Sequence, residues 1–189
     1  MSNQLGSYLP TPTKQRFTST FRIVSRFSFW IQLALGAISA IVLLLAVFSR
    51  NVTTQADNPV IGFGIFLGIA GILLLCIRIY WAFRYRRLAQ LLQAPNSEIH
   101  PKKEDIINVL QIGLILSLIG ILLTFLASEV TVVAILGKAL ALPQGVAVYR
   151  PENVIRSLDI FVVLANVNLI GAHLVGSVAS LGLLEWLDQ

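Results

Sequence analysis

The sequence holds very few of the residues that enzymes use for chemistry: one cysteine, one methionine and two histidines in 189 residues. With Cys76 alone, the chain can form no internal disulfide and no thiolate metal cluster. It has no Gly-rich phosphate loop, no H-E-x-x-H or C-x-x-C motif, and no nucleophile accompanied by a base and an orienting group. We therefore expect that the protein is not an enzyme, and we predict no cofactor.

Charged residues are also scarce, at 12% against 56% hydrophobic residues, and the mean hydropathy is +0.81. A soluble domain of this length would carry about 25% charged residues and no apolar runs of membrane length. The net charge of +5 would suggest nucleic acid in a soluble protein, but here the basic residues flank apolar segments. We predict no nucleic-acid partner, and instead a small polytopic protein in contact with the lipid bilayer.

Four apolar segments are long enough to cross a bilayer, which takes roughly 20 helical residues. They predict an all-α fold with four transmembrane helices at about 27–48, 60–83, 106–127 and 158–184. These spans form one membrane domain, 27–187, and the basic segment 1–26 precedes it. The apolar piece 129–142 is too short to span; it extends the third helix, lies at the interface or re-enters the membrane, and we favour extension.

The distribution of lysine and arginine predicts the orientation. Ten of the fourteen lie in the N-terminal segment or between Arg78 and Lys103, and four lie in the two opposite connections. Positive residues accumulate on the cytoplasmic side, so both termini and the segment 1–26 are predicted to be cytoplasmic. Arg78, near the end of the second span, is expected to snorkel toward the interface.

Two rows of small residues predict close helix contacts. In the second span, Gly64 and Gly68 form a G-x-x-x-G motif that Gly71 extends on the same side. In the third span, Gly113, Ser117 and Gly120 repeat at intervals of four and three residues. Small residues let two helix backbones approach closely in a membrane, so we expect these positions to face other helices rather than lipid.

The last span carries a polar stripe. At about 100° per residue, Asp159, Asn166 and His173 fall on one side together with two serines. Polar groups at membrane depth normally face a protein interior, so the stripe holds the bundle together by hydrogen bonds or, with Glu129, forms candidate stations of an ion path. Asp159 and His173 lie about 21 Å apart along a helix and cannot bind one ion together, so no metal site is defined.

Four stretches of the chain allow a family resemblance to be drawn: SFWIQLALG, IYWAFRYRRLA, TVVAILGKAL and LDIFVVLANVNLIGAHLVG. They resemble the small four-helix inner-envelope protein family of chloroplasts and its cyanobacterial relatives. That family is described both as a component of the Tic protein-import translocon and as an iron permease. Plant members begin with a transit peptide, and the absence of a comparable Ser-rich presequence here favours the cyanobacterial side.

The resemblance implies two functions of different classes. The first is an accessory role in membrane-protein translocation or assembly, with other integral membrane proteins of the translocation or photosynthetic assembly machinery as partners. The alternative is an iron permease that acts as an oligomer of this chain. In either case we expect a cyanobacterial plasma-membrane or thylakoid protein. The few candidate metal ligands favour the first function.

Overall fold

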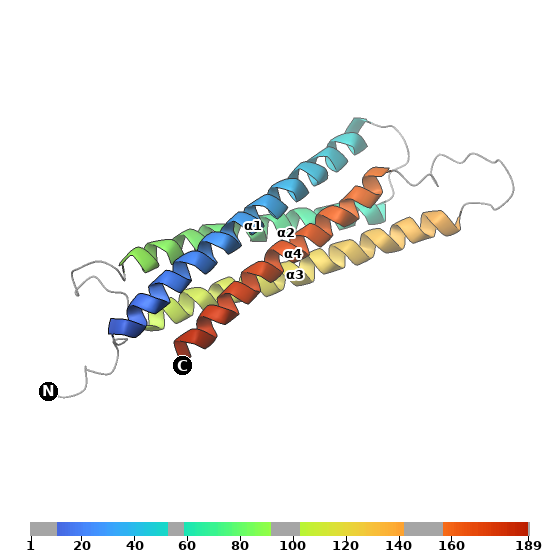
Figure 1. Cartoon of the computed structure of the whole chain (residues 1–189). Helices are drawn as coiled ribbons and strands as arrows, with labels where there is room; N and C mark the ends of the chain where they lie inside the picture. The colour runs from blue at the N-terminus through green and yellow to red at the C-terminus, as the bar shows by residue number, and fades with distance from the viewer. Residues whose placement is uncertain (1–10, 53–58, 92–102, 142–156, 189) are drawn as a thin grey trace.

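The computed structural model consists of four long α-helices in the residues it describes, 11–52, 59–91, 103–141 and 157–188 (Figure 1). Their bounds are Thr11–Val52 for α1, Pro59–Leu91 for α2, Lys103–Leu140 for α3 and Ser157–Asp188 for α4. Each contains a segment long and apolar enough to cross a membrane, namely Ile23–Ser49, Pro59–Phe83, Ile107–Leu140 and Ser157–Glu185. The predicted all-α fold class is confirmed, and the protein is an integral membrane protein.

The helices form an elongated bundle in which neighbours along the chain run in opposite directions (Figure 1). α1 and α3 both pack against α2 and α4, and α2 and α4 also touch each other across the middle of the bundle. α4 therefore contacts all three other helices. We call the end where α1 and α3 begin and α2 and α4 end the N-terminal end.

Seven-residue periodicity keeps one side of α3 turned toward the other helices. The buried positions of α3 alternate at spacings of three and four residues, which keeps them on one side of a slightly supercoiled helix. They are Leu110, Gly113, Ser117, Gly120, Thr124, Ala127, Thr131 and Ala134; Ser128, next to Ala127, is buried as well and is the exception to this spacing among the described side chains of α3. Most of these side chains are small, so the backbones of α2 and α4 lie close to α3.

The large apolar side chains mostly point outward, as a lipid environment requires. Leu44, Phe66, Leu122 and Val178, one from each helix, are all exposed. The interior has its own apolar cluster, which includes Leu43 of α1, but it also buries a large share of the polar residues. The bundle is thus apolar outside and partly polar inside, and the polar interior is where a site must be sought.

α3 and α1 each continue as helix beyond the membrane spans predicted from the sequence. α3 runs without interruption to Leu140, so the apolar piece 129–140 extends the third helix, as favoured from the sequence; residue 142 lies outside the described residues. With 38 residues, α3 is about 57 Å long, well beyond the roughly 30 Å of hydrocarbon. α1 begins at Thr11, so the basic segment before the first span continues as helix from there, while residues 1–10 lie outside the description.

Candidate functional site

The polar stripe of α4 faces the interior of the bundle. Asp159, Asn166, His173 and Ser180 follow one another at intervals of seven residues, and all four side chains are buried. Ser177 lies buried on the same side. We call these five residues the polar row. At about 1.5 Å per residue the row is about 31 Å long, so it reaches across a distance similar to the hydrocarbon core.

At the N-terminal end, the polar row meets an arginine from α2. Arg78 is only 2% exposed. Its Nε donates a hydrogen bond to Ser117 Oγ of α3 at 3.0 Å, and its Nη2 donates to Gly176 O at 3.0 Å and to Ser180 Oγ at 2.9 Å, both on α4. The guanidinium therefore links three helices, and the expectation that Arg78 snorkels to the interface is wrong.

α1 joins these three helices through Gln32, which is fully buried. Its Nε2 donates a hydrogen bond to Ser28 Oγ of the same helix at 2.7 Å. Gly176 makes the layer possible, because a Cβ there would lie 2.9 Å from Ser117 Oγ, 3.1 Å from Gln32 Nε2 and 3.3 Å from Arg78 Nε. Only a glycine leaves room for polar groups from three neighbouring helices. We call Gln32, Arg78, Ser117, Gly176 and Ser180 the Arg78 cluster.

A small cavity adjoins the Arg78 cluster. Its volume is about 10 Å³, which is room for about one water-sized particle. All four helices contribute to its wall: Ser25 and Ser28 of α1, Arg78 and Ala82 of α2, Leu110 of α3, and Ala179, Ser180 and Leu183 of α4. We call it the axial cavity, because it lies between the helices.

In the middle of the bundle, His173 packs against two glycines. Its Nε2 lies 3.2 Å from the carbonyl oxygen of Gly71 on α2 and donates to it, because a carbonyl can only accept. The ring also lies against Gly120 of α3, where an added Cβ would overlap the imidazole. Nδ1 of His173 finds no hydrogen-bond partner among the described residues. The imidazole thus fills the space that Gly120 of α3 provides and hydrogen-bonds the backbone of α2 at Gly71.

Asn166 lies seven residues before His173 on α4 and packs against Gly68 of α2. A Cβ on Gly68 would lie 2.6 Å from the Asn166 Oδ1 atom. Neither polar atom of this amide has a hydrogen-bond partner within the part of the chain that the structure describes. Ser39 of α1 donates to the neighbouring Ala165 carbonyl at 2.9 Å and so joins α1 to α4 at this level. A buried amide without a hydrogen bond is rare, and it marks Asn166 as an unusual member of the row.

At the end opposite the N-terminal end, Asp159 forms an ion pair. Lys138 Nζ of α3 donates to Asp159 Oδ2 at 2.9 Å, and each side chain is 11% exposed. This pair exists because α3 extends far enough to place Lys138 beside the start of α4. Glu129, the further candidate for an ion path, is exposed on α3, apart from the buried polar row.

The predicted packing glycines lie between helices. Gly64 faces Thr131 and the carbonyl of Ala127 on α3, and Gly71 faces Thr124. Thr124 and Thr131 each donate to a carbonyl of their own helix, at 2.7 Å, so their hydroxyls need no partner on α2. Gly113 and Ser117 are also buried on the inner side of α3.

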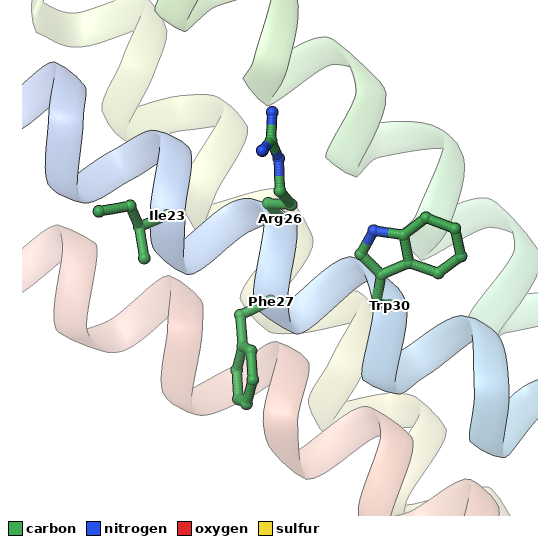
Figure 2. A pocket seen from close by; sticks show the side chains of 4 residues that line it. All are labelled: Ile23, Arg26, Phe27 and Trp30. Carbon is green, nitrogen blue, oxygen red and sulfur yellow. The ribbon is translucent and has the colours of Figure 1, made fainter.

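A wider groove lies on the outer surface of α1 near the N-terminal end (Figure 2). It measures about 390 Å³ and is lined by Ile23, Arg26, Phe27 and Trp30. Figure 2 shows Arg26 and Phe27 leaving the helix on opposite sides in this view, with Trp30 one turn further along. A cation beside exposed aromatic rings is typical of the membrane interface, where headgroups meet acyl chains. This groove suits contact with lipid.

Comparison with known proteins shows the family of the chain. A family model described as "Protein of unknown function (DUF3611)" matches residues 11–188. The chain belongs to this family. It is also similar to "Protein TIC 21, chloroplastic" of Arabidopsis thaliana, with 28% identity over 170 residues. These residues are 87% of this chain and 55% of that relative, so the chain spans about half the length of the relative. No solved structure matches.

The relative confirms the resemblance that the sequence stretches indicated. The match to the DUF3611 family includes all four helices and therefore the whole polar row, the Arg78 cluster and the Lys138–Asp159 pair. Among the described side chains, no three His, Cys, Asp or Glu residues gather in a way that could hold a metal ion. What the interior does offer is a set of hydrogen bonds and one ion pair that join different helices.

Proposed function

We propose that the protein is an accessory component of membrane-protein translocation or assembly, which acts as a helical bundle that other integral membrane proteins contact. The observation that carries this proposal is the Arg78 cluster, in which one guanidinium donates hydrogen bonds to two other helices inside the bundle. A bundle joined in this way suits a fixed scaffold. The name of the chloroplast relative supports a link with the import machinery of plastids.

The charge of Arg78 also favours the scaffold function and argues against a cation path through a single bundle. A fixed positive charge inside a pore raises the electrostatic barrier to cations. Arg78 lies between the helices, and the axial cavity beside it has room for about one water-sized particle. A hydrated metal ion would have to pass both obstacles. Exposed apolar side chains along all four helices, by contrast, provide ample surface for lipid and for the helices of partner proteins.

The orientation we propose places the N-terminal end of the bundle in the cytoplasm of a cyanobacterial cell, at its plasma or thylakoid membrane. Because Arg78 is buried, it no longer counts as an interfacial charge, but nine basic residues against four still favour this orientation. Single cysteines introduced in a Cys76→Ala background, by Glu185→Cys or by Ala141→Cys, test it. The first should react with an impermeant maleimide only from the cytoplasmic side and the second only from the opposite side. The reverse pattern would refute the orientation.

Copurification tests the proposed function directly. The tagged protein is isolated from native membranes in a mild detergent, and the associated proteins are identified against a control with an unrelated tagged four-helix membrane protein. We expect enrichment of components of a membrane-protein translocation or assembly machinery. If only lipid and copies of the chain itself are recovered, even after cross-linking in intact cells, the proposed function is wrong.

An iron permease is the second candidate, favoured by one observation: buried His173 and Asn166 carry ring and amide atoms that no described residue hydrogen-bonds. Because Arg78 opposes cations inside one bundle, such a path requires several copies of the chain. Iron uptake by proteoliposomes containing the wild type, Asp159→Asn and His173→Gln decides the question. The permease predicts uptake that both substitutions reduce, whereas absence of uptake by the folded wild type removes this candidate.

A further inference from the structure

The axial cavity has a wall chemistry that the proposed function does not use. Its polar wall consists of the guanidinium of Arg78 and the hydroxyls of Ser25, Ser28 and Ser180, and these residues come from three helices. All four residues are buried. In a site shielded from water, hydrogen bonds and charges act more strongly than at a surface.

Every one of these polar groups can donate a hydrogen bond into the cavity. An arginine has only donors. Ser28 Oγ accepts from Gln32 Nε2, and Ser180 Oγ accepts from Arg78 Nη2, so each hydroxyl keeps its own hydrogen for another acceptor. The hydroxyl of Ser25 has no hydrogen-bond partner among the described residues. Three hydroxyl hydrogens and a positive charge thus surround one small space.

The rest of the wall supplies no acceptor side chain. Ala82, Leu110, Ala179 and Leu183 are apolar. A metal cation would meet the guanidinium charge and find no carboxylate or imidazole in the wall. A water molecule would accept from these donors, but its own two hydrogens would find only the serine hydroxyl oxygens among the side chains of the wall, and two of these three oxygens already accept a hydrogen bond. An anion matches all four polar groups at once.

The volume selects among anions. A cavity of about 10 Å³ has room for about one water-sized particle, which excludes phosphate, sulfate and the headgroup of a lipid. We propose that the axial cavity binds one halide ion, chloride in the cell, held by the Arg78 guanidinium and the hydroxyls of Ser25, Ser28 and Ser180. Such an ion would join α1, α2 and α4 at the N-terminal end. This proposal does not depend on the function proposed above.

Chloride binding to the purified full-length protein tests the proposal. The protein in detergent micelles is dialysed against radiolabelled chloride, with gluconate keeping the ionic strength constant. We expect saturable binding of one chloride per chain, with displacement by bromide and not by sulfate. The midpoint of thermal unfolding should rise by about 2–4 °C at a chloride concentration about five times the dissociation constant. Absence of saturable chloride binding by the wild type would overturn the proposal.

Three variants locate the ion. Ser25→Ala removes one donor that has no other described partner, so chloride should bind about tenfold more weakly while the fold persists. Arg78→Gln should abolish binding. Ser39→Ala is the matched control, because it removes a buried serine of α1 that donates to Ala165 O instead, and it should leave chloride affinity unchanged. Should Arg78→Gln fail to fold, Ser25→Ala still decides: chloride affinity equal to that of the wild type would refute the site.

Discussion

The two ends of the bundle bury charge in different ways. Near the N-terminal end, the guanidinium of Arg78 donates to two hydroxyls and one carbonyl on two other helices and is almost fully shielded. At the opposite end, Lys138 of α3 forms an ion pair with Asp159 of α4, and both side chains keep some exposure. The first arrangement joins three helices through several hydrogen bonds, and the second joins α3 to α4 through an ion pair.

This difference predicts which end of the bundle contributes more to its stability. An arginine spreads five donors over a planar group and can satisfy neutral oxygens from several directions. A lysine and an aspartate form a more compact contact, whose strength falls as water and salt reach it. We therefore expect the N-terminal end to contribute more to stability than the opposite end. The middle of the bundle, where His173 lies against glycines, connects the two and should be the least tolerant of added volume.

The largest effect is expected in this middle layer. In Gly120→Leu the new side chain would occupy the space of the His173 ring, so α3 and α4 must separate. Overpacking of this kind costs about 3 kcal/mol or more, and most of the folded protein should be lost from membranes. Gly137→Leu is the matched control on the same helix, because nothing lies within 4 Å of the Cβ it adds. Equal yields of both variants, measured by gel filtration in detergent, would contradict the packing.

Removal of the guanidinium should have the next largest effect. Arg78→Leu leaves Ser117, Ser180 and the Gly176 carbonyl without their donor, and we expect the free energy of unfolding to fall by about 2 kcal/mol. Unfolding in mixed micelles with rising SDS measures this. Arg26→Leu removes an exposed arginine of α1 and should change stability by about 0.5 kcal/mol or less. If the two variants lose equal stability, Arg78 does not have the role described here.

The buried position of Arg78 could have been predicted in part from the sequence. Gly64, Gly71 and Arg78 follow one another at intervals of seven residues, so extending the glycine row by one heptad would have placed Arg78 on the inner side of α2. The aromatic residues and three more arginines that follow directly predict instead an interfacial position, as at many membrane helix ends. The spacing was therefore informative, and the composition of the flanking segment was misleading.

The partner of Asp159 could not be predicted in the same way. The stripe on α4 was visible as a helical periodicity, because such a pattern is local in the sequence. The Lys138–Asp159 pair depends on how far α3 extends and on the register between α3 and α4, which are joined through residues outside the described part of the chain. Glu129 and Lys138 lie nine residues apart and face opposite sides of α3, so no pair within this helix accounts for Lys138. Contacts between helices require the packing itself.

The smallest effect is expected for this ion pair. Asp159→Asn and Lys138→Met each remove one charge, and each should lower the free energy of unfolding by about 0.5–1 kcal/mol at low salt. Each single variant leaves the other charge partly buried and removes this ion pair, so the double variant should lose less stability than the sum of the two single variants. Unfolding of all four proteins in SDS titrations gives the coupling energy.

Salt distinguishes this pair from the Arg78 cluster. The side chains of Lys138 and Asp159 are each 11% exposed, so ions can approach them, and the coupling energy should fall between about 0.05 M and 0.5 M salt. Arg78→Leu should lose nearly the same stability at both salt concentrations, because its hydrogen bonds lie inside the bundle. Gluconate salts are used so that no halide is added. A coupling energy that does not change with salt would show that the pair is as well shielded as Arg78, and the contrast between the two ends would not hold.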